Sequence, residues 1–357
     1  MATTPHRPRR RKGGRRNGAP TIADVARLAG VSAMTVSRVI NGEANVRPAT
    51  RDIVKAAVEQ LNYAPNSAAR SLAGAGQRRI GLLYSNPSAS YLSEFLVGSL
   101  DQASRSDTQL IVEKCDPDDS GLAVARHLID SGVDALILPP PLSDFPPLLD
   151  LIEEEAIPYV LVGSLRPGID VDTVSIDDFA AARSMTNHIL SLGHRRIAFI
   201  QGNPLLSVSK QRLNGYLAAL EEAGVSHDPE LVVPGLFTYR SGLDAAEKLL
   251  GSDNPPSAIF ASNDDMAAAT VAVAHRRGLD VPGDLTVCGF DDTTLATAIW
   301  PELTTIRQPI ANMARSAIEL LVTRMKSKRT DEAKKVDLEF TLIRRQSDAA
   351  PRRRPPS

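Results

Sequence analysis

The feature that most constrains this chain is a regular alternation of short apolar runs and amphipathic helical segments after Arg79. The apolar runs predict strands at 80–84, 110–112, 135–138, 159–162, 197–200, 258–261 and 285–290. The intervening helical spacing predicts helices at 92–103, 122–129, 148–155, 213–223 and 266–276. Strands that alternate with helices of this length favour parallel sheets joined by right-handed crossovers. We therefore expect an α/β body.

The alternation covers about 260 residues, which is more than one small sheet usually holds, so we expect two parallel-sheet lobes. A helix at 310–326 and a strand at 337–343 should return across both of them. The lobes then combine early and late segments: about 79–176 plus 308–336, and about 178–306 plus 337–345. The body is predicted to span 79–345, with a disordered tail at 346–357.

Length and cysteine usage narrow the class of protein further. A chain of 357 residues is long enough for two or three folding units. It has no run of apolar residues long enough to span a membrane. The only cysteines, Cys115 and Cys288, are far apart, which excludes a disulfide scaffold and paired thiol ligands for zinc. We expect a cytoplasmic protein.

Charge is distributed unevenly along the chain. Residues 1–78 carry 14 Lys and Arg but four Asp and Glu, whereas the whole chain has a net charge of −1. A basic head on an acidic body indicates a polyanionic partner for the head alone. Residues 1–20 are rich in Arg, Gly and Pro and are predicted to be a disordered basic tail. Residues 17–31 lack the apolar core of a secretory signal, so we do not expect export.

Residues 21–65 show the pattern of a small all-α domain. Ile22, Val25, Ala26 and Ala29 recur at helical spacing, and Gly30 follows where a left-handed residue ends a helix. A second helix begins after Ser32, and a third is expected from about Pro48 to Leu61. Two short helices joined by a tight turn that contains glycine form a helix-turn-helix unit.

This unit would place its second helix in the major groove of DNA. Ala33, Met34 and Arg38 are then expected to point outward towards the bases. Arg38 can donate two hydrogen bonds to guanine, whereas Ala33 and Met34 offer apolar contacts only. Phosphate contacts, which position the protein without reading sequence, are expected from five further polar residues: Thr21, Ser32, Thr35, Ser37 and Asn41.

The complete string is more specific than the isolated pattern. The head reads TIADVARLAGVSAMTVSRVIN, followed by VRPATRDIVKAAVEQLNYAPNSAARSL. The body contains IGLL, GHRRIAFIQG, RLNGY, SNDDMA, GLDVPGDLTVCGFDD and PELTTIRQP. Together these motifs resemble the lactose-repressor family (LacI/GalR type) over roughly residues 21–345.

The resemblance implies a hinge between head and body at residues 66–78. Residues 66–73 match a hinge helix that folds when two protomers sit together on operator DNA, and they are too short to form a stable helix alone. Leu72 matches a leucine that wedges into the minor groove, which bends the duplex. Asn66 and Arg70 lie on the same segment and are expected to contact DNA. The alternative for Leu72 is packing against the partner protomer.

For the body, the resemblance implies the two-lobed architecture of periplasmic sugar-binding proteins, with a small effector bound in the cleft between lobes. Arg212 would supply a planar donor fork, and Asp291 an acceptor for paired hydroxyls. Asn263 can donate and accept, Phe237 can stack on the ligand, and Tyr91 would contribute from the other lobe. The alternatives are a turn cap for Asp291 and a core position for Phe237.

Two departures from the family bear on the effector. Gly163-Ser164 stand where an acidic residue often follows the strand in sugar-binding members, and Leu205-Leu206 lack the extra Arg of purine-responsive members. A sugar or a similar small hydroxylated metabolite is therefore favoured over a nucleobase.

Signatures of catalysis are absent from the sequence. It contains no GxGxxG, Walker-type, GxSxG or HExxH motif. We expect His194 to follow a helix and precede a buried strand, and Asp177-Asp178 to begin a helix. We therefore expect no enzymatic activity, no metal and no cofactor.

The function favoured by these observations is a homodimeric, effector-controlled transcriptional repressor, cytoplasmic and associated with the nucleoid. One alternative is a solute-binding protein, which would leave residues 21–73 unexplained. Another is a DNA-architectural protein without effector control, which would not need a two-lobed body.

Overall fold

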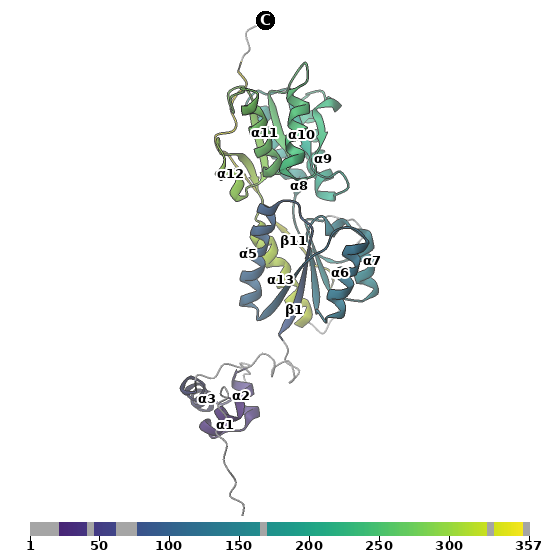
Figure 1. Cartoon of the computed structure of the whole chain (residues 1–357). Helices are drawn as coiled ribbons and strands as arrows, with labels where there is room; N and C mark the ends of the chain where they lie inside the picture. The colour runs from purple at the N-terminus through teal and green to yellow at the C-terminus, as the bar shows by residue number, and fades with distance from the viewer. Residues whose placement is uncertain (1–20, 41–45, 62–76, 165–169, 327–331, 353–357) are drawn as a thin grey trace, which may run out of the picture. The chain divides into compact units, whose positions relative to one another are not determined.

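The structure is a computed structural model of the whole chain, and it describes residues 21–40, 46–61, 77–164, 170–326 and 332–352. The chain divides into two compact units, the first ending at Gln77 and the second beginning at Arg78. Figure 1 labels the helices of both units.

The first unit contains three helices: α1 (Ile22–Ala29), α2 (Ala33–Ile40) and α3 (Pro48–Gln60). Val25, Val36 and Val54, one from each helix, are fully buried at its centre. Gly30 ends α1 with a φ of 64°, a left-handed conformation that glycine adopts without strain. The helix-turn-helix pattern predicted from the sequence is therefore present.

The second unit contains two separate six-stranded sheets. All neighbouring strands of the first sheet are parallel, in the order β11 (Lys335–Leu338), β5 (Asp172–Ile176), β4 (Tyr159–Val162), β3 (Ala135–Leu138), β1 (Arg78–Tyr84), β2 (Thr108–Lys114). The second sheet has the order β12 (Thr341–Ile343), β10 (Thr304–Arg307), β9 (Thr286–Asp291), β8 (Ala258–Ala261), β6 (Ile197–Gln201), β7 (Val232–Pro234). Its single antiparallel pair joins β10 and β12.

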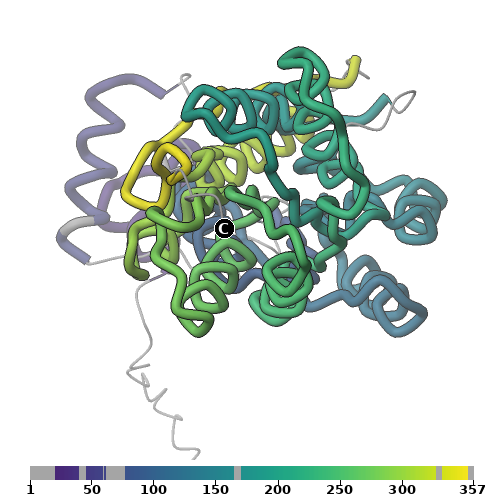
Figure 2. The backbone as a smooth tube through the Cα atoms, turned by 90° about the horizontal axis from the view of Figure 1, so that it is seen from above, coloured from purple at the N-terminus to yellow at the C-terminus, as the bar shows by residue number. Residues whose placement is uncertain are grey.

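Helices cover both faces of each sheet (Figures 1 and 2). In the first lobe, α5 (Ala89–Arg105) packs with α13 (Ile310–Lys326), and α6 (Asp119–Asp130) packs with α7 (Pro146–Glu154). The second lobe pairs its main helices in the same way: α8 (Asp178–Ser191) with α9 (Ser207–Glu222), and α10 (Tyr239–Leu250) with α11 (Asp264–Arg276). Three short elements complete the fold: η1 (Leu142–Asp144), η2 (Pro229–Leu231) and α12 (Thr294–Ala298).

The chain passes between the two lobes three times, after β5, after β10 and after β11. The third passage corrects the prediction of one strand at 337–343. Two short strands occur instead, because β11 pairs with β5 in the first sheet and β12 pairs with β10 in the second. One continuous strand cannot extend the edges of two separate sheets, so Glu339 and Phe340 connect them.

The C-terminal segment also differs from its prediction of a tail, because Ser347 and Asp348 are buried and hydrogen-bonded to the second lobe. The Ser347 hydroxyl accepts a hydrogen bond from the Thr304 amide (2.8 Å) and donates one to the Val287 carbonyl (2.6 Å). Asp348 is buried as well and bonds the Thr304 hydroxyl. Polar residues suggested a tail, but their partners lie on strands distant in the sequence. The predicted tail residues 1–20 and 353–357 lie outside the described residues.

Candidate functional site

The exposed face of α2 carries the side chains predicted to read bases. Ala33, Met34 and Arg38 are exposed, and Met34 retains 66% of its accessible surface. Val36 and Val39 point the other way and are buried against α1 and α3. Helical periodicity thus separates a packing face from an outward face, as a recognition helix requires.

Three of the hydroxyls predicted to contact phosphate lie at the helix starts: Thr21, Ser32 and Thr35. Ser32 accepts a hydrogen bond from the Thr35 amide (3.1 Å), and the two hydroxyls are 2.9 Å apart. Thr21 donates its amide and its hydroxyl to Asp24 (3.0 and 2.7 Å). The Thr21 bonds lower the pKa of Asp24. Ser37 is half-buried. The predicted DNA contacts Asn41, Asn66, Arg70 and Leu72 lie outside the described residues.

A cavity lies between the two lobes of the second unit, at the carboxyl ends of their strands. Its empty volume is about 520 Å³, part of which is open to solvent. It is lined by all five residues predicted to contact an effector: Tyr91, Arg212, Phe237, Asn263 and Asp291. The first lobe contributes the segment from Asn86 to Tyr91 together with Pro140, Pro141 and Gly163. The sequence thus brings these residues to one place, at the position where doubly wound folds bind ligands.

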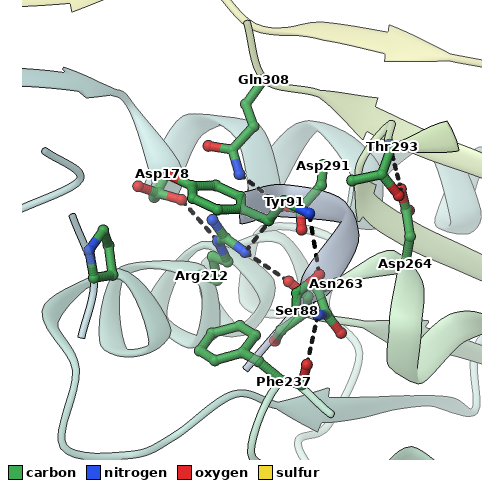
Figure 3. Close-up of polar contacts among 12 residues, drawn as sticks. Ser88, Tyr91, Asp178, Arg212, Phe237, Asn263, Asp264, Asp291, Thr293 and Gln308 are labelled. Atoms are coloured by element: carbon green, nitrogen blue, oxygen red, sulfur yellow. Dashed lines mark hydrogen bonds and ion pairs between the residues drawn. The ribbon is translucent and has the colours of Figure 1, made fainter. Parts of the chain in front are cut away.

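Arg212 is the most constrained side chain of the cavity (Figure 3). It is buried on α9, and its Nε donates to Asp178 Oδ1 (2.7 Å) while Nη1 donates to the Ser262 carbonyl (2.6 Å). Its guanidinium carbon lies 3.6 Å from the centre of the Phe290 ring. Charge pairing and stacking fix the plane of the guanidinium, so the protein itself orients this side chain for ligand binding.

Asp291 ends β9 in an unusual backbone conformation, with a φ of 112°. Its Oδ1 accepts a hydrogen bond from Gln308 Nε2 (2.6 Å) and lies 3.8 Å from Arg212 Nη1. Burial raises the pKa of Asp291 well above its usual range, and the Arg212 charge opposes that shift. A strained, buried residue that is held by its neighbours is typical of functional sites. The alternative of a simple turn cap does not account for the Gln308 and Arg212 contacts.

Asn263 lines the cavity and also caps the start of α11. Its Oδ1 accepts from the Met266 amide (3.0 Å), and its Nδ2 donates to the Phe237 carbonyl (3.0 Å). Phe237 has a φ of 59° and a half-buried ring. That ring fills the space beside Gly202, where an added Cβ would lie 2.0 Å from it. Asn263 therefore fixes the loop that holds Phe237 at the cavity wall.

The first lobe supplies Tyr91 from the start of α5. Its ring stacks at 6.2 Å on Phe95 and is buried, and burial raises the pKa of its phenol. One turn earlier, the Ser88 hydroxyl donates to Asp265 Oδ2 in the second lobe (2.6 Å). This hydrogen bond crosses the cleft directly beside the cavity.

A second hydrogen-bonded pair crosses the cleft on another side. Asp144 Oδ2 of the first lobe accepts from the amide and the hydroxyl of Ser207, at 3.0 and 2.9 Å. Ser207 is the first residue of α9, where unpaired amides and the helix dipole favour a negative charge. The carboxylate of one lobe therefore caps a helix of the other.

Asp264, which follows the cavity residue Asn263, is a buried carboxyl that joins α11 to neighbouring segments. It is fully buried, and it accepts hydrogen bonds from the Thr293 amide (2.8 Å) and the Thr305 hydroxyl (2.7 Å). Burial raises the pKa of Asp264 to about 7. An added Cβ at Gly289 would lie 2.4 Å from its Oδ1, so glycine lets α11 approach β9 closely.

Sequence reasoning missed several residues of the cavity. Asp177 caps α8 as expected of a helix start, but Asp178 turns inward to Arg212. Gln308 and the Ser88–Asp265 pair were not singled out either. The PELTTIRQP motif contains Gln308 and could have pointed to that residue. Contacts across the cleft join distant segments and have no local sequence pattern. His194 follows α8 and precedes β6, as predicted.

Metal-binding clusters and membrane-spanning helices are both absent from the residues that the structure describes. No group of three or more His, Cys, Asp or Glu is arranged to hold a metal ion. No helix within the described ranges combines the length and apolarity needed to cross a membrane.

Both units of the chain are similar to known protein families. Residues 21–66 match the bacterial regulatory proteins of the lacI family, and residues 186–347 match the periplasmic binding protein-like domain. Catabolite control protein A of Priestia megaterium is 35% identical over 92% of this chain and 98% of its own. The chain belongs to the lacI family of bacterial regulatory proteins.

Solved structures of this family share the fold. The structure of a transcriptional regulator CelR–cellobiose complex is 34% identical, with a TM-score of 0.71 over 92% of this chain and 99% of that one. The lac repressor dimer bound to operator and the anti-inducer ONPF is 25% identical, with a TM-score of 0.76 over 93% and 100%. The chain is thus a DNA-binding transcriptional regulator and not an enzyme, and the solute-binding and architectural alternatives are not favoured.

Proposed function

We propose that this lacI-family regulator is a homodimeric repressor whose affinity for operator DNA is set by a small effector held between the lobes of its second unit. The observation that carries this proposal is the convergence of Tyr91, Arg212, Phe237, Asn263 and Asp291 on one cavity formed by both lobes. Two structures of similar fold support it, because one is a CelR–cellobiose complex and the other a lac repressor dimer bound to operator and an anti-inducer.

DNA recognition is assigned to the outward face of α2. Arg38 would read guanine, with Ala33 and Met34 making apolar contacts to base edges. Thr21, Ser32, Thr35, Ser37 and Asn41 would contact phosphates, which fix register. Asn66, Arg70 and Leu72 would act in the minor groove through a hinge helix at 66–73 that folds on binding. Two protomers would read a pseudo-palindromic operator. We further propose that the protein acts in the cytoplasm, associated with the nucleoid, because its partner is DNA.

Effector control follows from the position of the cavity. A ligand that contacts both lobes favours the arrangement of the lobes in which those contacts are best. Asp178 lies at the first passage between lobes and Gln308 at the second, so the groups that hold Arg212 and Asp291 lie where the chain would bend. The ligand would thereby change the lobe arrangement that the head depends on, with reciprocal coupling between the two sites.

The test is a pair of variants in the cavity. Asp291→Asn and Arg212→Ala should retain operator binding but lose the response to the effector that moves the wild type, measured by fluorescence anisotropy of labelled operator. Arg240→Ala removes a side chain that is 82% exposed on α10 and serves as the control. A normal response in either cavity variant would exclude this cavity as the effector site.

A further inference from the structure

The cavity has two walls of different chemistry. One wall presents hydrogen-bonding groups, from Ser88 and Tyr91 in the first lobe and from Asn263, Asp291 and Gln308 in and beside the second. The other wall is formed by Pro140, Pro141 and Gly163 of the first lobe with Leu206 and Val208 of the second. None of the side chains of this second wall can donate or accept a hydrogen bond.

The apolar wall is continuous across the cleft. An added Cβ at Gly163 would lie 3.0 Å from Pro140 Cγ and 3.6 Å from Val208 Cγ1, so these three residues meet at one point. Gly163 has a φ of 67°, a left-handed conformation that glycine adopts without strain, so that backbone alone forms the wall at this position. Leu206 and Val208 are 7% and 6% exposed. The wall is therefore a fixed surface and not a pair of mobile side chains.

Polar groups near this wall are engaged or turned away from it. The amide and hydroxyl of Ser207, between Leu206 and Val208, are both bonded to Asp144. The hydroxyls of Ser164 and Ser209 are buried without a hydrogen-bond partner, and neither residue lines the cavity. A ligand hydroxyl directed at this wall would lose its bonds to water without gaining a partner.

The charge of the cavity selects against anions. Among the described residues that line it, Arg212 is the only cation, and its guanidinium is already matched by Asp178 at 2.7 Å and Asp291 at 3.8 Å. A phosphorylated or carboxylated ligand would add a further negative charge beside two carboxyls. An uncharged ligand avoids that repulsion.

We propose that the effector is a neutral, hydroxylated ring compound that ends in an alkyl group, and that Leu206, Val208 and Pro140 select that alkyl end. This proposal rests on the proposed function and names the ligand class of the same cavity. Two sources share the chemistry: a deoxy sugar, in which methyl replaces hydroxymethyl, and an alkyl glycoside, in which the alkyl group sits on the anomeric oxygen.

The experiment measures binding to the full chain by isothermal titration calorimetry with matched ligand pairs. One arm compares 6-deoxyhexoses with their parent hexoses (D-fucose with D-galactose, and L-rhamnose with L-mannose). The other compares methyl glycosides with the free sugars, and a third ligand set contains hexose 6-phosphates. We expect the alkyl-ended member of one pair to bind roughly 10–100-fold more tightly than its partner, and the phosphates not to bind. Equal or reversed preference in every pair, or phosphate binding, would overturn the proposal.

Two variants assign the preference to the wall. Val208→Thr keeps the shape of the side chain and adds a hydroxyl, and Leu206→Thr adds one at the neighbouring position. Each should reduce the preference to less than threefold. Leu205→Thr is the matched control, because Leu205 is adjacent in sequence, 80% exposed and outside the cavity lining. A preference that survives both cavity variants would contradict the assignment.

The outcomes separate this proposal from the proposed function. If a hydroxyl-ended sugar binds best, and Arg212→Ala abolishes its binding, the effector site stands and the apolar selection is wrong. If no neutral sugar or glycoside binds, the ligand class is wrong, whereas operator binding through α2 is decided separately by the anisotropy titration.

Discussion

At the scale of single residues, the site depends on side chains whose geometry is fixed by their neighbours. Arg212 combines an ion pair with Asp178, a bond to the Ser262 carbonyl and stacking on Phe290. Each contact uses a different property of the guanidinium: its charge, its several donors and its flat face. A lysine would keep the first property and lose the other two.

Arg212→Lys should therefore weaken effector binding by about tenfold or more, since part of a charge-assisted network worth about 1.5–3 kcal/mol is lost. The melting temperature should also fall, because Asp178 keeps a poorer partner inside the protein. Calorimetric titration with the effector and a thermal melt measure the two effects. Arg240→Lys, on an exposed surface, should change neither. Unaltered effector affinity in Arg212→Lys would contradict the role given to the planar fork.

Arg38→Ala tests base reading by α2. Loss of a bidentate contact to guanine should cost about 1–3 kcal/mol on the operator, and much less on random duplex. Arg27→Ala on α1 removes the same charge from a side chain that is 76% exposed, and is the control for a general loss of attraction to DNA. Competition binding at fixed salt separates a loss of base reading from a general loss of attraction to DNA. An equal loss on operator and random duplex would exclude base reading by Arg38.

The sequence could predict part of the site but not the hydrogen bonds and ion pairs that hold its side chains in place. The family resemblance predicts Arg212, Phe237, Asn263 and Asp291, and the position after the first strand predicts Tyr91; all five line the cavity. The partners that hold them were not, because those contacts join segments far apart in the chain. Hydrogen-bond pairing across a cleft is a property of the tertiary structure and leaves no periodic signal in sequence.

At the scale of elements, the starts of helices hold the lobes together. Asp144 of η1 bonds the first turn of α9, and Ser88, which caps α5, bonds Asp265 in the first turn of α11. Each bond places an acidic group of one element against a polar group at the other side of the cleft. These bonds favour the arrangement of the lobes seen in the structure, in which both lobes line one cavity.

Asp144→Asn keeps the size of this side chain and removes its charge from the α9 N-terminus. We expect effector affinity to fall roughly three- to tenfold, since a partly exposed charge-assisted pair contributes about 1 kcal/mol to closure. Asp150→Asn on the exposed face of α7 is the matched control. Calorimetric titration of both variants is the measurement, and equal affinities would show that the Asp144–Ser207 pair does not stabilise the ligand-bound arrangement.

The C-terminal segment is attached through His194. Its Nδ1 lies 2.8 Å from the Ser257 hydroxyl and its Nε2 lies 2.8 Å from the Ala349 carbonyl, so a neutral ring with the proton on Nε2 fits both. Burial lowers the pKa of His194 below its usual value of 6.5, despite opposing effects of Ala349 and Asp348. The stability that this neutral ring contributes is present above pH 6.5 and is lost as the pH falls towards the lowered pKa.

Acidification should therefore destabilise the wild type more than His194→Gln. Melting temperatures of both proteins are compared at pH 7.5 and pH 5.5. The difference in melting temperature between the wild type and His194→Gln should be largest at pH 7.5 and smaller at pH 5.5. His275→Gln, at an exposed position near the end of α11, should follow the wild-type profile. Parallel profiles for the wild type and His194→Gln would refute the linkage.

Elements were easier to predict than their edges. Apolar runs and helical spacing identified two α/β lobes, because the period of a pattern reports which face is buried. The strand expected at 337–343 is two strands, and the tail expected from residue 346 is packed. Both errors concern segments whose structure comes from distant partners: β5 and β10 for the strands, and Thr304 and Val287 for the packed segment.

At the scale of the whole molecule, the three passages of the chain between lobes couple the cavity to the rest of the protein. Asp178 and Gln308 lie at two of these passages and contact Arg212 and Asp291. A ligand that engages Arg212 and Asp291 therefore acts on the segments about which the lobes would move. This arrangement suits a regulator, because the binding energy of a small molecule biases a motion that spans both lobes.

The most direct test of the central claim is a fluorescence-anisotropy titration of the full chain at fixed salt. The probe is duplex DNA from upstream of its own gene, and the competitor is random duplex, each with and without the neutral ligands above. Salt is held constant because a basic head binds any duplex at low ionic strength. The account predicts a preference of roughly a thousandfold for one duplex, changed by a ligand that Arg212→Ala no longer senses. Equal affinity for every upstream and random duplex, unmoved by any ligand, would contradict it.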